Sequence, residues 1–278
     1  MTNSRRTFGL GVTISTTVSA RHERPPIVSD FLPDPLPEKL YEGKAKILYP
    51  TDDADVLLSF FKDDATAFNA QKRGSIAGKG EVNCTLSTHL FQQLEAAGIA
   101  THWIDTPAKD WMRVKTVEIV PLEVVVRNIA AGSLCKQTGI ALGTPIDPPL
   151  VEFFYKDDDL GDPLLTRDRL RLLDVASEET VETLKAMALE IDRILQDFFA
   201  RGDLTLVDFK LEFGTTRSGE IVLADEISPD TCRLWDRRES DPQRRILDKD
   251  RFRQDLGKVE DAYETVLQRV ADVLEAEK

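Results

Sequence analysis

The chain has 278 residues, 41% of them hydrophobic, which is enough to bury a full core in one or two domains. Its formal net charge of -13 argues against a nucleic-acid-binding surface, which needs a basic face, although local clusters of Lys and Arg can still hold an anionic substrate. Cys84, Cys135 and Cys232 lack zinc-ligand spacing and indicate reduced thiols, and no apolar run is long enough to span a membrane.

Residues 1–38 differ in composition from the rest of the chain. Before residue 21 the chain contains Arg5-Arg6, many Ser and Thr and no acid, a composition similar to a twin-arginine export signal or an organellar transit peptide. A disordered extension fits the same residues. Five prolines between Pro25 and Pro37 predict a linker without regular structure. We therefore expect the folded part to begin near Lys39, in a protein that is otherwise of cytoplasmic type.

A glycine followed by two lysines marks the first expected hairpin, over residues 40–49. Gly43 suits a tight turn between two short strands, and residues 57–61 predict the next strand. The backbone N–H groups and the ammonium groups of Lys44 and Lys46 can close over an anion such as a phosphate. Short Gly-Lys turns are also common in ordinary surface hairpins, so this pattern alone does not decide between the two interpretations.

A polar, glycine-containing loop follows at residues 62–80 and leads into an expected helix over residues 81–97. Gly98 is expected to stop this helix. Loops of this composition often carry function on a rigid scaffold, and they also occur as plain crossings over the surface.

Residues 120–126 are almost wholly apolar, which predicts a central strand. Residues 111–114 predict a strand before it. Arg127 ends the central strand, and Ser133 follows shortly after. An arginine at the tip of a buried strand suits bidentate binding of a carboxylate or phosphate, and a structural arginine paired with an acid is the alternative.

Residues 178–199 place apolar side chains at helical spacing and predict an amphipathic helix. Ser177 is the expected N-cap, and Gly202 follows the expected end. A closing helix is predicted in the same way from Lys249 onward.

The pattern around residue 210 organises the rest of the chain. Residues 205–214 alternate apolar and charged side chains, as a half-buried strand does, and put Asp208, Lys210 and Glu212 on one face. A turn at residues 214–219 and a second apolar run complete a predicted β-hairpin. With pairing about the middle of that turn, Asp225 is expected opposite Asp208 and close to Glu212. A slip of one residue would turn the faces over.

The charged face of this hairpin has two interpretations. It can be an ordinary solvated face of an antiparallel sheet. However, the second strand is apolar until Asp225, which indicates burial, and buried carboxylates need a metal or cationic partners. We therefore expect Glu212 and Asp225 to hold a hard, oxygen-preferring cation such as Mg²⁺. Residues 228–236 are expected to form a loop that carries Asp230 and Arg233.

Seven stretches of the chain, in the same order, resemble the phosphoribosylaminoimidazole-succinocarboxamide synthase (SAICAR synthetase) family. The two longest are IVPLEVVVRNIAAGS at residues 119–133 and LVDFKLEFG at residues 206–214. The shorter ones lie at residues 41–46, 61–69, 224–230, 233–236 and 247–257. The resemblance runs from Leu40 to the C-terminus, and the segment before Lys39 departs from it.

The resemblance implies an α+β, ATP-grasp-like fold with two mixed α/β lobes, antiparallel sheets and the active site in the cleft between the lobes. The expected boundaries are an extension at 1–38, an N-terminal ATP-loop lobe at 39–119 and a C-terminal catalytic lobe at 120–278. The implied activity is that of a carbon–nitrogen ligase of purine biosynthesis. It joins L-aspartate to carboxyaminoimidazole ribonucleotide with ATP and Mg²⁺, through an acyl phosphate. The expected partners are these small molecules, without nucleic acid or membrane, and assembly into a homo-oligomer is left open.

The family's site residues carry over onto this sequence by position. The residues implied for ATP are Lys44, Lys46, Glu212 and Asp225, and the last two are also implied for the metal. The residues implied for the ribonucleotide and its carboxylate are Arg127, Ser133, Arg233 and Asp230. The residues implied for catalysis are Lys210, Asp208 and Arg233.

Two other classes of function fit parts of the pattern. A small-molecule kinase would also place an Asp-x-Lys strand beside a metal carboxylate, but it would need no amino-acid pocket and would release ADP without aspartate. A nucleotide-binding regulatory protein would keep the loops without the chemistry. The charged positions of the matched stretches are all intact, which argues against that second class.

Overall fold

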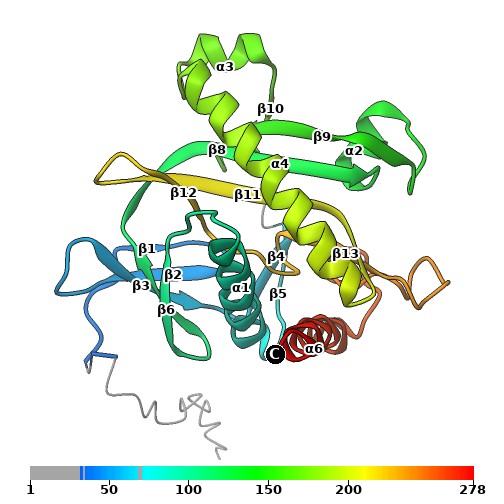
Figure 1. The fold of residues 1–278 in the computed structure, drawn as a ribbon, viewed down its shortest axis with the longest axis horizontal. Coiled ribbons are helices and arrows are strands. Elements are labelled where there is room, and N and C mark those ends of the chain that lie inside the picture. The colour runs from blue at the N-terminus through cyan, green and yellow to red at the C-terminus, as the bar shows by residue number, and fades with distance from the viewer. Residues whose placement is uncertain (1–31, 34, 68–70) are drawn as a thin grey trace, which may run out of the picture.

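The computed structural model describes residues 32–33, 35–67 and 71–278, which form two larger antiparallel sheets, a two-stranded sheet and the helices packed on them (Figure 1). Most of the extension expected at residues 1–38 therefore lies outside the described residues. Within the described ranges, no helix is both long enough and apolar enough to cross a membrane.

The first sheet has the strand order β1-β2-β3-β7-β6. Its strands are β1 (Tyr41–Glu42), β2 (Lys46–Pro50), β3 (Val56–Phe61), β6 (Trp103–Ala108) and β7 (Trp111–Lys115). Helix α1 (Lys79–Ala96) packs against β3, β6 and β7, and the small sheet of β4 (Asp64–Ala67) and β5 (Lys72–Ser75) precedes it. The strands predicted at 40–49, 57–61 and 111–114 are confirmed, and the helix predicted at 81–97 begins earlier, at Lys79.

Asp63 explains this earlier helix start. Its Oδ1 accepts the Gly80 amide at 2.8 Å and its Oδ2 accepts the Gly78 amide at 3.1 Å, which satisfies amides of the first turn. Gly80 lies so close to β3 that an added Cβ would be 2.4 Å from the Phe61 carbonyl oxygen. The close approach carries Lys79 into the interior, where it is 2% exposed.

The second sheet has the strand order β10-β9-β8-β11-β12, and β13 also pairs with β11. Its strands are β8 (Val117–Ile129), β9 (Pro145–Tyr155), β10 (Leu164–Leu165), β11 (Leu204–Thr216), β12 (Ile221–Ala224) and β13 (Cys232–Asp236). Two short helices, α2 (Gly132–Thr138) and α3 (Arg167–Leu173), lie in its connections. The central strand predicted at 120–126 is confirmed as the middle of β8.

Helix α4 (Glu178–Arg201) lies across the second sheet, as Figure 1 shows, and covers its apolar face. The Ser177 hydroxyl accepts the Thr180 amide at 3.0 Å, so the predicted N-cap is confirmed. The alternation in β11 buries Phe209, Leu211 and Phe213, which are each at most 1% exposed and belong to the main core. At about 25 cal/mol per Å² of buried apolar surface, these side chains and those of α4 dominate the stability of this layer.

Three predictions about the segments after residue 204 are wrong. β11 continues to Thr216, so the turn comes later than expected and Glu212 pairs with Ala224. Asp208 therefore lies opposite Arg127 and Arg233, and not opposite Asp225 as predicted. The loop expected at residues 228–236 contains strand β13, which forms because β11 offers it a pairing edge. The closing helix is divided into α5 (Asp250–Arg253) and α6 (Val259–Ala276). Between these two helices, three residues adopt left-handed backbone conformations: Asp255, Gly257 and Lys258.

The two larger sheets are joined next to β12 by backbone hydrogen bonds. Thr101 forms a parallel bridge with Leu223. The His102 amide donates to the Leu223 carbonyl at 2.8 Å, and the Leu223 amide donates to the Ala100 carbonyl at 3.0 Å. The segment that leads into β6 of the first sheet is therefore fixed to a strand of the second.

Candidate active site

A cleft of about 810 Å³ is lined by residues from both larger sheets. On the first sheet, the register puts Leu57 beside Val114 and Leu48 beside Ser59, and all four line the cleft. Val117 and Ile119, at the start of β8, extend the apolar lining. This part of the cleft offers a mostly apolar slot of the kind that accepts a planar ring.

On the second sheet, the cleft is lined by charged side chains. The register places Arg127 beside Asp208 and Glu123 beside Glu212, with Lys210 between the two acids of its own strand. The face predicted to carry Asp208, Lys210 and Glu212 together is therefore the face that borders the cleft.

Lys46, Lys156 and Lys210 gather around Glu212 and Asp225, and we call these five residues the lysine cluster. Lys210 Nζ lies 2.5 Å from Glu212 Oε1 and 3.8 Å from Asp225 Oδ2. Lys156 Nζ, from the end of β9, reaches Glu212 Oε1 at 2.8 Å. Lys46 Nζ forms an ion pair with Asp225. The two acids expected to hold a cation thus share Lys210, and each has one further lysine.

Electrostatics in the lysine cluster favour the charged forms of its three lysines and of Asp225. Burial opposes the charge of Lys210, but Glu212, Asp225 and Glu123 outweigh it and raise the pKa of this lysine well above its usual value. Burial likewise opposes ionisation of Asp225, but Lys46 and Lys210 lower its pKa below the usual range. The cluster holds ammonium groups beside carboxylates, a set suited to a phosphate chain and a divalent cation.

Lys46 spans the cleft from β2 of the first sheet. Besides its pair with Asp225, its Nζ lies 2.9 Å from Glu226 Oε1. Asp225 directly follows β12 in a left-handed conformation with φ 64, which turns its side chain out of the strand. Asp225 therefore reaches the cluster although it does not occupy the strand position expected for it.

Arg127 and Arg233 share Asp208, and we call these residues, together with Asp250, the arginine cluster. Arg127 Nη1 donates to Asp208 Oδ2 at 2.9 Å, and Arg233 Nη1 donates to the same oxygen at 2.8 Å. Arg233 Nε donates to Asp250 Oδ2 at 2.8 Å. Burial opposes the charge of Arg233, but Asp208 and Asp250 outweigh it and raise its pKa. Both guanidinium groups are therefore held as fixed cations beside the cleft.

Ser133 and Gly132 complete the surroundings of these arginines. Arg127 Nη2 donates to the Ser133 hydroxyl at 3.3 Å. Gly132 has φ 55, and an added Cβ would lie 2.5 Å from Arg233 Nη2. The glycine thus lets the Arg233 guanidinium lie flat against the backbone at the start of α2.

Asp230 also lines the cleft, but three side chains already bind its carboxylate. Its Oδ2 accepts from Lys79 Nζ at 3.1 Å and Lys249 Nζ at 3.2 Å, and its Oδ1 accepts from the Tyr263 hydroxyl at 2.7 Å. Burial opposes ionisation, but Lys249 and Lys79 outweigh it and lower the pKa of Asp230. Asp230 therefore fixes two lysines at this end of the cleft.

Lys44, which the sequence predicts as an ATP-binding residue, forms its ion pair with a residue outside the lysine and arginine clusters. Its Nζ is 2.6 Å from Asp158 Oδ1 in the β9–β10 connection, and both side chains are exposed. Lys44 still lines the cleft, as Asp158 does.

The sequence interpretation missed several charged residues of the site. Lys156 lies in the cleft because β9 pairs with β8, and its only sequence signal is a lysine that ends an apolar run before three aspartates. Lys79 lies in a Gly-Lys-Gly sequence at a helix start, which is a usable signal. Glu152 Oε2 accepts from Arg127 Nε at 2.6 Å, and nothing local in the sequence indicates that pair.

His102 lines the cleft next to the lysine cluster. Burial and the nearby Lys46 lower its pKa to about 3, so the imidazole is neutral near pH 7. Its Nε2 is buried and has no hydrogen-bond partner within the described part of the chain.

Comparisons with known proteins agree with one another. The family model of SAICAR synthetase matches residues 39–270. The chain is 66% identical to a phosphoribosylaminoimidazole-succinocarboxamide synthase of Acaryochloris marina over 84% of this chain and 95% of that protein. Its structure is similar to that of the corresponding synthase of Ehrlichia chaffeensis, with a TM-score of 0.80, 41% identity, and 84% and 98% of the two chains covered. It is also similar to a SAICAR synthetase in complex with ADP, with a TM-score of 0.79, 45% identity, and 84% and 97% covered.

Proposed function

The chain belongs to the SAICAR synthetase family, carbon–nitrogen ligases that join L-aspartate to carboxyaminoimidazole ribonucleotide with ATP, and we propose that this reaction takes place in the cleft through an acyl phosphate. We further propose an ATP-grasp-like arrangement of two lobes, residues 39–119 and 120–278, after an extension at 1–38. The meeting of one sheet from each side at a single cleft supports this division. The observation that carries the proposal is the adjacency of the lysine and arginine clusters on one face of β8 and β11.

The nucleotide fits the lysine end of the cleft. The apolar slot of Leu48, Leu57, Val114, Val117 and Ile119 suits a planar base. The ammonium groups beyond it suit the phosphate chain, and Lys44 and Lys46 are proposed to bind it together with Lys210. A relative in complex with ADP supports the binding of an adenine nucleotide.

A magnesium ion fits beside Glu212 and Asp225. Magnesium in nucleotide sites is commonly bound by one or two carboxylates together with substrate phosphates and waters. The described residues contain no group of three or more His, Cys, Asp or Glu arranged to hold a metal, so two carboxylates are what the chain offers and the nucleotide must supply the rest. The ion would neutralise charge on the phosphoryl group during transfer. Lys210 then lies between the two acids and the carboxylate that accepts the phosphoryl group. Its ammonium charge also neutralises charge on the phosphoryl group during transfer.

The ribonucleotide fits the arginine end. Asp208 occupies one edge of both guanidinium groups, which keeps Arg127 and Arg233 oriented toward a shared anion. The Ser133 hydroxyl next to Arg127 Nη2 adds a donor for a phosphate or carboxylate oxygen. We propose that Arg127, Ser133 and Arg233 bind the ribonucleotide, and that Asp230 acts by holding Lys79 and Lys249 in place.

The chemistry that follows needs little acid–base help from the protein. A carboxylate is a poor electrophile, and transfer of the γ-phosphoryl group to its oxygen creates a leaving group. The amine of aspartate then attacks the acyl carbon, the carbon–oxygen bond breaks, and phosphate departs with the electron pair. The amine proton passes to water, since lysines lower the pKa of Asp225 and Asp230 and make these two carboxylates poor bases. The three thiols are free cysteines, which supports a cytoplasmic location.

A coupled ADP-release assay with each substrate omitted in turn tests this function. We expect ADP release only when ATP, the ribonucleotide and L-aspartate are all present, apart from a single-turnover burst without aspartate. Sustained ADP release without aspartate contradicts a ligase and favours a kinase. No turnover with all three substrates favours a regulatory protein.

A further inference from the structure

The arginine cluster is backed by a second polar cluster on the opposite face of the same sheet, formed by Asn128, Asp192 and Gln196. Asn128 follows Arg127 in β8, and successive side chains of a strand point to opposite faces. Asn128 Nδ2 donates to Asp192 Oδ1 at 2.7 Å. Gln196 Nε2 donates to Asp192 Oδ2 at 2.8 Å and to Asn128 Oδ1 at 3.1 Å. Three side chains thus close a ring of hydrogen bonds between β8 and α4.

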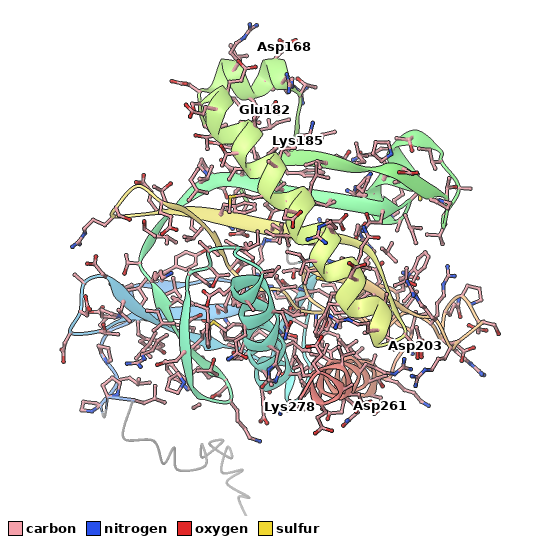
Figure 2. All side chains as sticks on the ribbon, in the orientation of Figure 1. Asp168, Glu182, Lys185, Asp203, Asp261 and Lys278 are labelled. Atoms are coloured by element: carbon pink, nitrogen blue, oxygen red, sulfur yellow. The ribbon has the colours of Figure 1, made fainter. Side chains whose placement is uncertain are left out.

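Asp192 differs from the other charged residues of its helix. Figure 2 labels Glu182 and Lys185 along α4, and Glu182 is exposed, whereas Asp192 is 2% exposed. No ion pair of Asp192 occurs among the described residues, and its partners are two neutral amides. Burial raises its pKa, opposed by those amides. A buried carboxylate without a cation destabilises a fold, so packing alone does not account for it.

Both strands around this cluster are irregular. The paired residues of β8 and β11 end at Arg127 and Asp208. Beyond this pair, Asn128 Nδ2 also donates to the Leu206 carbonyl at 3.3 Å, so a side chain connects the strands where paired residues stop. β11 shifts register against β13 between Leu206 and Asp208, and β8 shifts against β9 after Arg127. Irregularities of this kind re-aim side chains next to active sites.

We propose that Asp192, acting through Asn128, is a positioning residue for Arg127 and thereby sets the affinity for the ribonucleotide. This inference rests on the proposed function, since it takes Arg127 as a ribonucleotide contact. Asp192 touches no part of the cleft. Its carboxylate fixes the side-chain amide of Asn128, and this amide connects β8 to β11. The connection in turn fixes the backbone at Arg127 and Asp208 and so orients these two side chains. Lys46 and Lys156 of the lysine cluster lie outside β8 and β11, and Lys210 and Glu212 lie where these two strands pair in register, so the nucleotide should be insensitive to Asp192.

The test is calorimetric titration of the full chain with the ribonucleotide and, separately, with a non-hydrolysable ATP analogue. Asp192→Asn keeps the shape of the side chain, but its amide nitrogen cannot accept a hydrogen bond. The variant therefore cannot accept from both Asn128 and Gln196. We expect it to weaken ribonucleotide binding about tenfold and to change ATP-analogue binding less than about twofold. The matched control is Asp197→Asn, an exposed acid on the same helix, which should change neither affinity. If Asp192→Asn does not fold, Gln196→Met removes the donor to both partners and carries the same expectation.

A double variant decides whether Asp192 acts through Arg127. Adding Asp192→Asn to Arg127→Lys should weaken ribonucleotide binding less than about threefold further, because the group to be positioned is already altered. A full additional tenfold loss overturns the inference, as does equal weakening of both ligands or an unchanged ribonucleotide affinity in Asp192→Asn. If the unaltered protein binds no ribonucleotide, the proposed function fails and this inference falls with it. Failure confined to the variants leaves the proposed function standing.

Discussion

The lysine cluster and the arginine cluster lie side by side on β8 and β11, yet they are built differently. Lys46 and Lys210 lie in strands of the two different sheets, Lys156 directly follows β9, and the three share carboxylates as point charges. Arg127 and Arg233 belong to one sheet, and Asp208 fixes both at defined edges. Ammonium groups can redistribute when a phosphate chain and a cation enter, whereas guanidinium groups select a shape. The lysine end of the cleft is therefore expected to select ligands by their charge, and the arginine end by their shape.

The largest loss of turnover is expected from substitutions that remove a charge from the lysine cluster. Glu212→Gln and Asp225→Asn each remove a negative charge from the proposed magnesium position, and we expect each variant to fold and to lose about a hundredfold or more in turnover. The measurement is the rate of ADP release over a magnesium series, with unfolding curves for each protein. Glu118→Gln, an exposed acid on β8, is the control and should keep its rate. Normal turnover of either variant at limiting magnesium contradicts the assignment.

The next effect should depend on geometry. Arg127→Lys and Arg233→Lys keep the charge but lose the planar donor edge, so ribonucleotide binding should weaken by about thirty- to a hundredfold while ATP-analogue binding changes little. Titration calorimetry with each ligand measures this, and Arg217→Lys, an exposed arginine, serves as control. Equal weakening of both ligands indicates structural damage. An unchanged ribonucleotide affinity removes these arginines from the site.

A pH-dependent effect is expected beneath the arginine cluster. Asp248 is fully buried and accepts the amides of Leu234 and Asp250, both at 2.8 Å. Burial and the neighbouring Asp250 raise its pKa from 3.8 to about 7. Its protonated form therefore stabilises the fold fully below pH 3.8, and this contribution is lost as the pH rises to about 7. The loss should reach up to about 1.4 kcal/mol per pH unit and stop above about pH 7.

Urea unfolding between about pH 5 and about pH 8 tests this sign. The difference in free energy of unfolding between Asp248→Asn and the unaltered protein should change up to about pH 7 and then remain constant. Asp168→Asn, an exposed acid, is the control and should give a difference that does not vary with pH. A constant difference for Asp248→Asn over the whole range contradicts the expectation.

The smallest effect is expected at Lys44 and Asp158. Both side chains are exposed, with 43% and 67% of their surface accessible, so water screens the pair. Asp158→Asn should change the free energy of unfolding by less than about 0.5 kcal/mol and the KM for ATP by less than about threefold. Urea unfolding and steady-state kinetics measure the two quantities. A large rise in KM would place Asp158 among the residues on which nucleotide binding depends.

The sequence predicted what depends on local pattern. The alternation in β11 put Asp208, Lys210 and Glu212 on the face that borders the cleft, and the apolar run before Arg127 gave the central strand β8. The resemblance to the family extended this to the order of the motifs. These features are encoded within ten or so neighbouring residues and need no knowledge of the rest of the fold.

What depends on distant pairing could not be predicted in the same way. The predicted register between β11 and β12 is wrong because β11 continues past Gly214. No local sequence pattern marks the residue at which the strand ends and the turn begins. β13 looked like a loop because its five residues become a strand only beside β11. Lys79 reaches Asp230 through the packing of α1, and Lys156 reaches the cleft through the pairing of β9 with β8.

The backbone connection at Leu223 limits how the molecule can move. The amides of His102 and Leu223 bond across the two sheets, so separation of the sheets at this point would expose both to solvent. Their rates of hydrogen exchange should therefore be slow and should approach those of global unfolding. We therefore expect ligand entry to displace exposed side chains that line the cleft, such as Lys44 and Asp158. Binding is thus expected to change side-chain order on a nanosecond scale more than the angle between the sheets.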